Sequence, residues 1–526
     1  MSYRVLIPTA GTGSRLEGLT KYVNKSLVGI ANRPTISHII EQFPPDVEFV
    51  IALGHKGHLV KEFLQLAYPH RLFYFSEVDP FEGPGSGLGL SILSCKKYLQ
   101  QPFVFTSCDT LVREPIPSLQ TNWMGYAESV EIGQYRTIEI HSGIVKSVNE
   151  KGIGKGNSDK PYIGLAGIKD YELFWDAMEE GGEESIAMGE AYGMNQLLSA
   201  GIQAKRFTWF DTGNIQSLEM TRNAYRQEHE PNILEKADEA IWFVDDQVIK
   251  FSNNTKFISN RVERAAAIKE FIPNVTDATE HMYKYVKASG DVLSNCITIP
   301  LFEKFLYHSL SFWKLEKLDN VKTSKFRNSC MRFYKDKSFE RVDLFYKNFG
   351  KNDGKETING FNVPTLQELL DTIDWNWLAD GLPGRFHGDF HFENILYSDS
   401  TQQFTFLDWR QEFDGSLTTG DIYYDLAKLL HGLIISHKLI VQDHYWIDWQ
   451  NDAIRYDFHR KQILVECERY FYEWLKKNNF DVVKVKTLTA LVYLNIAALH
   501  HDPYCKLLFA LGKTILHDTL TQSKTL

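Results

Sequence analysis

A glycine turn near the start of the chain combines residue types that could bind phosphate groups. The run Gly11-Thr12-Gly13-Ser14-Arg15 directly follows a short apolar segment. Its exposed backbone N–H groups could surround phosphate oxygens, and Arg15 could neutralise their charge. Position 16 is Leu where a dinucleotide fingerprint has its third glycine, and no GxxxxGK[ST] segment follows. The turn therefore predicts a phosphate site of neither the dinucleotide-binding nor the Walker type.

Two aspartates in the N-terminal half stand where they could hold a metal ion. Asp109 follows the apolar run Phe103–Thr106, and Asp211 precedes a predicted helix. Magnesium prefers hard oxygen ligands and keeps several waters, so two carboxylates and the phosphate oxygens of a nucleotide are sufficient to bind it. Either aspartate alone could be a turn or helix-capping residue. Their order behind the glycine turn leads us to predict Asp109 and Asp211 as magnesium ligands.

The segments that would position these residues alternate between strands and helices. Short β-branched or apolar runs are followed by amphipathic stretches of helical length. The expected elements are strand 4–8, helix 35–42, strand 47–53, helix 56–67, strand 71–75, helix 88–99 and strand 103–106. This order predicts a Rossmann-like α/β domain, with a mainly parallel sheet, helices on both faces and ligands beyond the carboxyl ends of the strands.

The N-terminal motifs resemble those of nucleotidyltransferases that join a sugar phosphate or aminoalcohol phosphate to an NTP. The resemblance is carried by GTGSRL (11–16), NKSL (24–27) and NRP (32–34), together with the two aspartates. It implies that the glycine turn holds the NTP phosphates. It also implies that Arg15 and Lys25 stabilise charge on the α-phosphate and on the departing pyrophosphate.

Two further segments resemble parts of the same family's site. The run Glu82–Leu88, which contains Gly85 and Gly87, is similar to the segment that contacts the nucleotide base and ribose; turn chemistry alone would also explain its glycines. Lys151 matches the lysine that grips the acceptor's phosphate, with a solvated surface lysine as the alternative. The resemblance implies in-line attack of a phosphomonoester oxygen on the α-phosphorus, helped mainly by positioning and charge neutralisation.

The C-terminal half opens with a pattern that could orient the phosphates of ATP. Residues Glu239–Phe251 alternate in polarity around Asp245-Asp246 and predict a β-hairpin, with Lys250 on its second strand. Glu263 follows thirteen positions later, in a predicted helix that ends before Pro273. A strand lysine and a helix glutamate at this spacing can form the ion pair of a kinase. An unrelated surface lysine and glutamate are the alternative.

A compact motif in the C-terminal half resembles the signature of aminoglycoside phosphotransferases, choline kinases and related kinases. Its parts are the HGDxxxxN segment within Phe386–Leu396 and an apolar strand that ends at Asp408. The resemblance implies that Asp389 accepts or orients the proton of the substrate hydroxyl, and that Asn394 and Asp408 hold Mg²⁺. It further implies that Asp425, at the start of a later helix, braces the catalytic loop.

Aromatic residues are dense between and after these motifs. At helical spacing such residues usually form a core, although some could line an acceptor pocket. A quaternary ammonium substrate would favour an aromatic cage, whereas a sugar would favour stacked rings with paired polar groups. The residues concerned are Phe302, Phe305, Tyr307, Phe312, Trp313, Trp375, Trp377, Tyr445, Trp446 and Trp449.

The length of the chain predicts two domains, because 526 residues exceed what one hydrophobic core usually organises. We expect a nucleotidyltransferase domain over 1–230 and a two-lobed, protein-kinase-like α+β domain over 231–526. Within the second domain the N-lobe is expected at about 237–290 and the C-lobe at about 291–526. The polar segment around Pro231 marks the predicted boundary.

The net charge and the composition of the chain limit the classes of partner that we expect it to bind. A formal net charge of −10 argues against nucleic acid, and no apolar run predicts membrane insertion. The N-terminus lacks the basic and apolar regions of a signal peptide, so we expect a cytoplasmic protein. Six scattered cysteines without a CxxC pair argue against a zinc site or a disulfide framework. Small alcohols and nucleotides are the expected partners. The sequence leaves open whether the chain forms a homo-oligomer.

The two halves together suggest consecutive reactions, because a kinase makes a phosphomonoester and a nucleotidyltransferase consumes one. We expect ATP-dependent phosphorylation of a sugar, polyol or aminoalcohol, followed by transfer from a second NTP, with CTP or UTP favoured over GTP and Mg²⁺ in both sites. The product would be an activated donor for surface glycan synthesis. One alternative is a choline kinase joined to a CTP:phosphocholine cytidylyltransferase. The other is that one half is a non-catalytic module that senses nucleotide.

Overall fold

The computed structural model describes residues 3–128, 133–152, 159–226 and 238–522. Contacts divide the chain into two compact units. The first unit comprises Met1–Ile258 with Val275–Val286, and the second comprises Ser259–Asn274 with Lys287–Leu526. The predicted boundary at residue 230 falls outside the described residues and stays a prediction.

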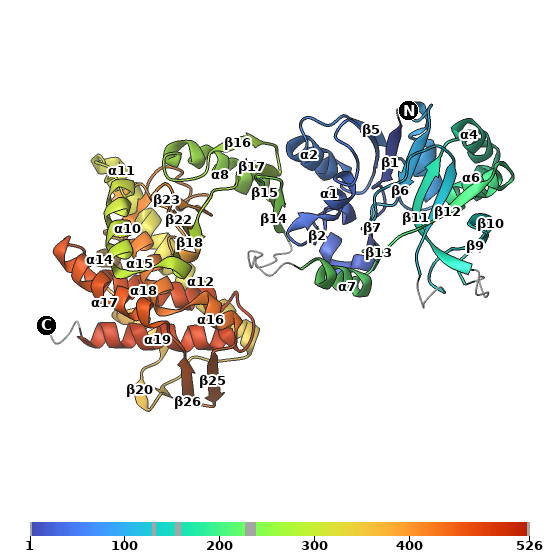
Figure 1. The fold of residues 1–526 in the computed structure, drawn as a ribbon. Coiled ribbons are helices and arrows are strands. Elements are labelled where there is room, and N and C mark those ends of the chain that lie inside the picture. The colour runs from blue at the N-terminus through green and yellow to red at the C-terminus, as the bar shows by residue number, and fades with distance from the viewer. Residues whose placement is uncertain (1–2, 129–132, 153–158, 227–237, 523–526) are drawn as a thin grey trace. The chain divides into compact units, whose positions relative to one another are not determined.

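The first unit is built on a nine-stranded sheet (Figure 1), in the order β5-β4-β1-β6-β11-β8-β12-β10-β9. Its strands, with those of the smaller sheets, are β1 Arg4–Pro8, β2 Gly29–Ile30, β3 Arg33–Pro34, β4 Glu48–Leu53, β5 Phe73–Glu77, β6 Phe103–Thr106, β7 Thr110–Val112, β8 Asn122–Tyr126, β9 Thr137–His141, β10 Ile144–Asn149, β11 Asp159–Ile168, β12 Ile202–Arg206, β13 Trp209–Asp211, β14 Glu239–Val244, β15 Gln247–Ser252, β16 Val275–Ala278 and β17 Met282–Val286. Its α-helices are α1 Thr35–Ile40, α2 Gly57–Ala67, α3 Leu88–Leu93, α4 Tyr171–Glu180, α5 Gly182–Met188, α6 Glu190–Gln196 and α7 Ile215–Tyr225. Short 3-10 turns cover Ser14–Thr20, Lys25–Leu27, Lys96–Tyr98 and Leu197–Ala200.

The α/β prediction for this unit is confirmed, and the helices cover both faces of the sheet. Successive side chains of β1 point to opposite faces: Val5 and Ile7 join one buried cluster with α1 and α2, and Leu6 joins another with α3, α4 and α6. Strands β5, β4, β1 and β6 are parallel. Beyond β6 the sheet becomes mixed, because β11 runs antiparallel to both β6 and β8.

A four-stranded antiparallel sheet in the order β14-β15-β17-β16 also belongs to the first unit. The predicted hairpin is present as β14 and β15, and it packs against α2. The ring of Trp242 meets that of Phe63 at 5.2 Å between centroids, and Phe243 N donates a hydrogen bond to Asn32 O at 2.8 Å. The Lys284 ammonium donates to Leu66 O at 2.8 Å. This small sheet therefore shares a buried core with the N-terminal α/β fold.

The second unit is mainly helical. Its α-helices are α9 Leu293–Cys296, α10 Ile299–Phe312, α11 Asn320–Met331, α12 Lys337–Phe349, α13 Leu366–Thr372, α14 Trp375–Ala379, α15 Ile422–Ile434, α16 His437–Val441, α17 Gln462–Lys477, α18 Val482–Ala497 and α19 Tyr504–Gln522. A π-helical turn covers Arg332–Asp336, a 3-10 turn covers Phe392–Asn394, and α8 Thr255–Ile268 is shared between the units. Its strands are β18 Asp291–Val292, β19 Glu356–Ile358, β20 Phe361–Val363, β21 Pro383–Gly384, β22 Ile395–Ser398, β23 Gln403–Phe406, β24 Gly420–Asp421, β25 Tyr445–Gln450 and β26 Ala453–Phe458.

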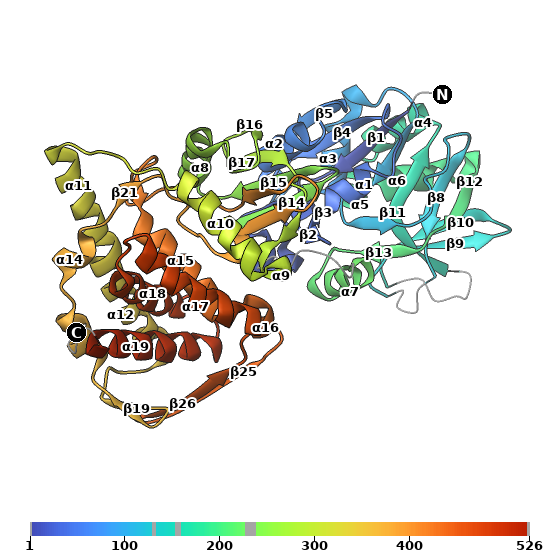
Figure 2. The same ribbon diagram turned by 60° about the vertical axis from the view of Figure 1, so that its left-hand side comes forward.

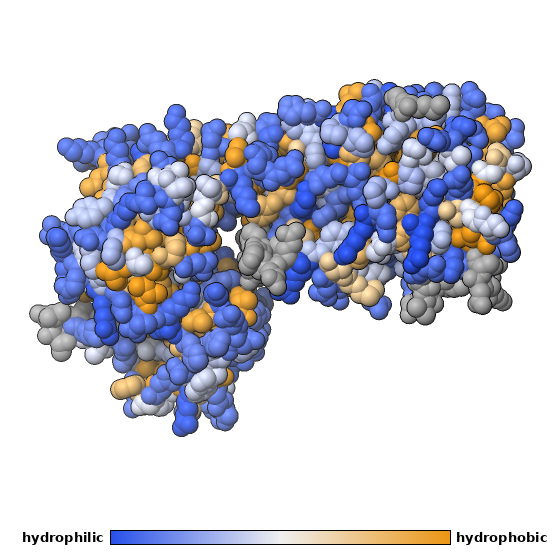
Figure 3. Space-filling view, viewed as in Figure 1, coloured by the Kyte–Doolittle hydropathy of each residue, from blue (hydrophilic) through white to orange (hydrophobic). Residues whose placement is uncertain are grey.

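Helices α15, α17, α18 and α19 pack side by side in this unit (Figure 2). Most of α15 and α18 is buried, which is why their sequences are apolar almost all round. The predicted aromatic residues divide: Phe302, Phe305 and Phe312 lie in the core, whereas Tyr307 and Trp446 are exposed. Hydrophilic residues cover much of the face shown in Figure 3. None of the described helices is both long and apolar enough to cross a bilayer.

Candidate active sites

The two N-terminal aspartates converge on one point. A Cβ atom placed on Gly213 would lie 3.1 Å from Asp211 Oδ1, 3.3 Å from Asp109 Oδ2 and 3.3 Å from Arg15 Nη2. Two carboxylates and a guanidinium thus face one small space that a larger residue at 213 would enter. Two carboxylates with this approach fit the oxygen donor set that magnesium prefers.

Backbone pairing explains why aspartates so far apart in sequence meet. Strand β13 pairs with β7 so that Asp211 stands opposite Thr110, the neighbour of Asp109. Thr212 N donates to Asp109 O at 3.0 Å, and Gly213 N donates to Asp211 Oδ1 at 2.9 Å. The register of this two-stranded ribbon therefore fixes the separation of the two carboxylates.

Lys25 completes this cluster. Its ammonium lies 3.1 Å from Asp109 Oδ2. Burial alone would lower the pKa of Lys25 and raise that of Asp109; their mutual attraction reverses both shifts, so both groups are charged at neutral pH. Asn24 holds the preceding turn, because its side chain donates to Thr9 O at 2.9 Å. Burial, and then the charge of Asp109, raise the pKa of Asp211.

The glycine turn is open to solvent at its first residues. Gly11 and Ser14 are exposed, and space around Gly11 is free to 4 Å. Gly13 has φ 69°, and a Cβ there would stand 2.9 Å from Lys25 Cβ. A glycine at 13 is therefore required by the backbone and by the close approach of Lys25. The structure brings the turn next to Lys25, as the predicted phosphate site needs.

The remaining N-terminal predictions lie on other segments. Gly85 is exposed with φ 82°, and Gly87 begins α3, where a Cβ would stand 2.4 Å from Ile186 O. Close packing against α5 thus explains the glycine at 87. Lys151 is an exposed turn residue after β10. The nucleotide and acceptor contacts of these three residues stay predictions.

Sequence reasoning missed two side chains near the aspartates. Glu190, at the start of α6, is buried; burial raises its pKa to about 7, Asp109 adds to this, and Arg136 opposes it. Tyr135 donates its hydroxyl to Asp211 Oδ2 at 3.1 Å. Both lie outside the motifs, so only the tertiary structure reveals them.

The kinase-like motif forms one connected loop in the second unit. The amide of Asn394 donates to Asp389 Oδ2 at 3.0 Å and to Asp389 O at 2.9 Å. This orientation leaves Asn394 Oδ1 available for a cation. Leu407 N donates to Asn394 O at 2.7 Å, which brings the neighbouring Asp408 to the same loop. Asp408 has φ 57°, which is an uncommon backbone conformation for a residue other than glycine.

The carboxylate of Asp425 holds this loop in place through hydrogen bonds, as the resemblance implied. Its carboxylate accepts from His387 N and Gly388 N, each at 2.7 Å, and from Trp313 Nε1 at 3.0 Å. Burial raises the pKa of Asp425 to about 6, and these three donors partly offset that effect. Gly388 has φ 88°, and a Cβ there would stand 2.5 Å from Arg410 Cβ.

Asp389 lies between cationic and polar groups. Lys428, on α15, places its ammonium 2.7 Å from Asp389 Oδ1, and His391 Nε2 lies 3.5 Å from Asp389 Oδ2. Burial opposes ionisation, but Lys428 and His391 hold the pKa of Asp389 well below its ordinary value. Burial lowers the pKa of His387 to about 3, so this histidine is neutral and accepts from Asp389 N at 3.2 Å.

The sequence analysis did not predict Lys428 at this site, and it did not predict Arg261. Its guanidinium donates to Asp408 Oδ1 at 2.9 Å, and its carbonyl accepts from Trp409 Nε1 at 3.0 Å. The predicted partners Lys250 and Glu263 fall in different units: Lys250 is buried on β15, and Glu263 is exposed on α8. Their ion pair stays a prediction.

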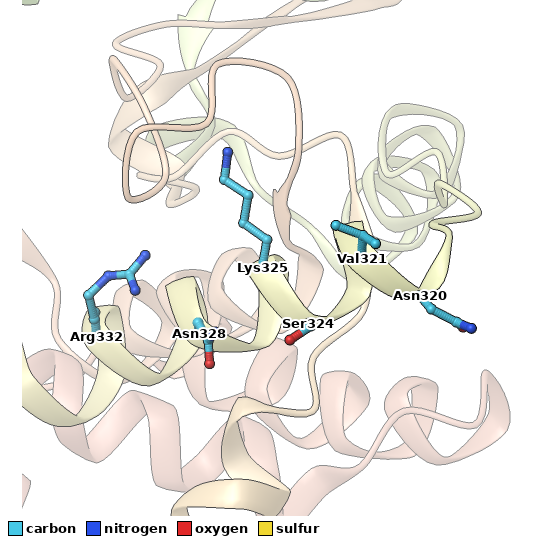
Figure 4. Close-up of a pocket in the computed structure, with 6 residues that line it drawn as sticks. All are labelled: Asn320, Val321, Ser324, Lys325, Asn328 and Arg332. Carbon is cyan, nitrogen blue, oxygen red and sulfur yellow. The ribbon is translucent and has the colours of Figure 1, made fainter.

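A hollow of about 520 Å³ lies on the outer face of α11 (Figure 4). It is lined by Asn320, Val321, Ser324, Lys325, Asn328 and Arg332. Arg332 is already engaged, because its guanidinium lies 2.5 Å from Asp414 Oδ2. The sequence-predicted site residues do not line this hollow.

Comparison with known proteins identifies the region around the second site. The model of the phosphotransferase enzyme family, APH, matches residues 352–485. The matched region contains Asp389, Asn394, Asp408 and Asp425, and the resemblance to this family is confirmed there. No curated protein matches the chain significantly.

Solved structures similar to part of the chain are nucleotidyltransferases. A UDP-glucose pyrophosphorylase complexed with UDP-glucose is 18% identical, with a TM-score of 0.37, over 43% of this chain and 98% of its own. The CTP:phosphocholine cytidylyltransferase from Streptococcus pneumoniae is 13% identical, with a TM-score of 0.37, over 43% of this chain and 100% of its own. A putative glucose-1-phosphate thymidylyltransferase from Bacillus anthracis is 14% identical, with a TM-score of 0.37, over 45% and 98%.

Proposed function

We propose that the chain is a bifunctional enzyme that phosphorylates a small alcohol and then couples the product to a nucleotide. The observation that supports this proposal is that each unit holds its own cluster of oxygen-bearing side chains beside a lysine. In the first unit Asp109 and Asp211 lie near Lys25, and in the second Asp389 and Asn394 lie near Lys428. Both clusters suit phosphoryl chemistry, in which positioning and charge neutralisation supply most of the rate.

In the kinase reaction the alcohol oxygen bonds to the γ-phosphorus of ATP as the bond to the β-phosphate oxygen breaks and ADP leaves. Asp389 orients the hydroxyl and takes up its proton, since its low pKa keeps it ionised until the alcohol becomes acidic in the transition state. Asn394 and Asp408 would hold Mg²⁺, which neutralises phosphate charge when bound. Asp425 and His387 keep the loop in place.

In the transfer reaction the phosphomonoester oxygen bonds to the α-phosphorus of a second NTP, and pyrophosphate leaves. The glycine turn binds the phosphates through backbone N–H groups, while Arg15 and Lys25 neutralise charge on the α-phosphate and the leaving group. Asp109 and Asp211 would hold Mg²⁺. We propose CTP or UTP as the second nucleotide, and an activated donor for surface glycan synthesis as the product.

The test incubates the full chain with ATP, CTP, UTP, GTP and a panel of sugars, polyols and aminoalcohols, and identifies products by mass. We expect a phosphomonoester and then a nucleotide-linked product. Asp109→Asn should accumulate the phosphomonoester, and Asp389→Asn should form neither product. The exposed residues Asp176 and Asp399 offer matched controls, Asp176→Asn and Asp399→Asn, which should retain both reactions. Normal pyrophosphate release by Asp109→Asn contradicts the assignment of the N-terminal site.

A further inference from the structure

Four cationic side chains of the second unit, Lys337, Arg341, Arg410 and Lys428, lie close enough to interact electrostatically, and the charge of Asp389 also acts on Lys337. Lys428 contacts the Asp389 carboxylate directly, and Arg410 follows two residues after Asp408. Lys337 and Arg341 come from one face of α12, one turn apart. None of the four belongs to the motif that identified the loop.

Arg410 packs on the catalytic loop, and Arg410 and Lys337 both contact the ring of Phe333. Arg410 N donates to His387 O at 2.9 Å, and Arg410 Cβ fills the space beside Gly388. The guanidinium of Arg410 lies 4.9 Å from the centre of the Phe333 ring, and the ammonium of Lys337 lies 4.2 Å from the same ring. One aromatic ring therefore links a cation on the loop to a cation on α12.

The positive charge of this group exceeds the negative charge available to it. Lys428 is paired with Asp389, whereas within the described part of the chain Lys337, Arg341 and Arg410 have no carboxylate within 4 Å. Arg410 Nε donates to the carbonyl of Glu412, at 3.1 Å, and not to a carboxylate of any described residue. Cations held together without counter-charges are costly, so the site favours an arriving anion.

The electrostatics of Lys337 agree with this geometry. Burial lowers its pKa to about 7, and the charges of Arg410, Arg341 and Lys428 act in the same direction, while Asp389 opposes them. An ammonium with so low a pKa regains its proton when an anion binds beside it. The same cations would repel a quaternary ammonium group, and the Phe333 ring that could contact such a group already contacts Lys337 and Arg410.

We propose that the acceptor of the kinase reaction is an anionic alcohol, whose carboxylate or phosphate group binds Lys337, Arg341 and Arg410 while its hydroxyl meets Asp389. The proposal rests on the kinase function proposed above and narrows its substrate to hydroxy acids, sugar acids and alcohols that already carry a phosphate. Choline and other cationic alcohols are excluded as substrates.

The test measures ADP formation by the full chain with matched pairs of alcohols: galactose and galacturonate, glycerol and glycerate, and glycerol and glycerol phosphate, with choline as the cationic arm. The anionic member of at least one pair should have a kcat/KM about tenfold or more above its neutral partner, since charge-assisted hydrogen bonds are worth about 1.5–3 kcal/mol. The carboxylate and phosphate arms distinguish the two sources of charge. Equal or better turnover of neutral alcohols or choline overturns the proposal and leaves the kinase function standing. Transfer to no alcohol in the panel overturns both.

Variants separate acceptor binding from ATP binding. Lys337→Met keeps the apolar stem on Phe333 and removes the charge, so KM for the anionic alcohol should rise about tenfold while KM for ATP stays constant. Lys347, exposed on the same helix, provides the control Lys347→Met, which should change neither value. A rise in KM for ATP alone would show that the cations bind the γ-phosphate and would overturn the proposal. If Lys337→Met fails to fold by circular dichroism, Arg341→Met is tested by the same criteria.

Discussion

The two carboxylate clusters differ in how far apart in sequence their residues lie. In the first unit, Asp109 and Asp211 come from distant parts of the chain, and the pairing of β7 with β13 brings them together. In the second, Asp389, Asn394 and Asp408 lie on one loop and hairpin, joined by local hydrogen bonds. Yet each cluster pairs one aspartate with a lysine, at 3.1 Å in the first and 2.7 Å in the second. The lysine supplies counter-charge in both, whichever way the ligands are assembled.

The largest effects should come from removing one aspartate that we propose as a metal ligand or proton acceptor in each cluster. Asp389→Asn should lower the kinase kcat about 10³-fold or more, and Asp109→Asn should lower nucleotidyl transfer by a similar factor, because each group acts in the transition state. Each variant should leave the other activity within about twofold. Separate assays check this: ADP formation from the alcohol, and pyrophosphate release with the phosphomonoester supplied directly. Loss of both activities in either variant would contradict the division into two sites.

Substitutions of Lys25 and Lys428 should affect the two reactions to different extents. Lys25→Ala should lower nucleotidyl transfer about 100-fold, because Lys25 lies beside Asp109 and neutralises the nucleotide phosphates in the proposed reaction. Lys428→Met should lower the kinase kcat only about tenfold, because Lys428 acts through the position and charge of Asp389. Kinetics of both reactions, with thermal melting to confirm folding, measure the difference. Equal losses would mean that Lys428 also contacts a reacting phosphate.

The bracing aspartate should give the kinase reaction an acid limb that is set by Asp425. The pKa of Asp425 is raised to about 6, so it is a carboxylate above pH 6 and protonates as pH falls through that value. A neutral carboxyl accepts fewer hydrogen bonds from His387 N, Gly388 N and Trp313, so kinase kcat should fall about tenfold between pH 7 and pH 5. Because the folded pKa lies above the unfolded value near 4, this group's contribution to stability decreases as pH rises from about 4 to 6.

That pH profile is checked against Asp425→Asn, which should have lower kinase kcat at neutral pH and no longer show the same acid limb. Nucleotidyl transfer by the variant should be unaffected. An unchanged acid limb would assign the titration to another group.

The smallest effect should come from the space between the N-terminal carboxylates. Gly213→Ala adds a methyl group 3.1–3.3 Å from Asp211, Asp109 and Arg15, and should lower nucleotidyl transfer about fivefold by pushing them apart. Gly18→Ala is the control, since nothing lies within 4 Å of its added Cβ. Steady-state rates at several Mg²⁺ concentrations measure the change, which extra Mg²⁺ should partly rescue.

The sequence predicted local features better than assembled ones. The strands at 4–8 and 103–106 and the hairpin around Asp245-Asp246 are present as expected, because periodicity and turn residues act over short distances. The pattern did not predict the mixed second half of the large sheet, since the direction of β11 depends on distant pairing. Helix 88–99 ends earlier, at Leu93, and a 3-10 turn follows.

Among the site residues, too, those on one local segment could be predicted and those brought together by tertiary packing could not. The connected loop of Asp389, Asn394 and Asp408 could be predicted because its spacing is fixed along the chain. Glu190 and Lys428 could not, because each reaches an aspartate only through the packing of its helix, and a charged residue in a helix usually faces solvent. Metal binding by the predicted ligands stays a prediction.

The sheet β14–β17 belongs to the core of the first unit, although it follows that unit's α/β fold in sequence. Trp242, on β14, is buried against Phe63 of α2, and Lys250 lies on the neighbouring strand. A fragment that begins at residue 238 would expose the apolar side of this sheet to water, and one that begins at 287 would lose Lys250 altogether. No single cut in the chain can therefore separate the two units intact, because Ser259–Asn274 of the second unit lies in sequence between two segments of the first.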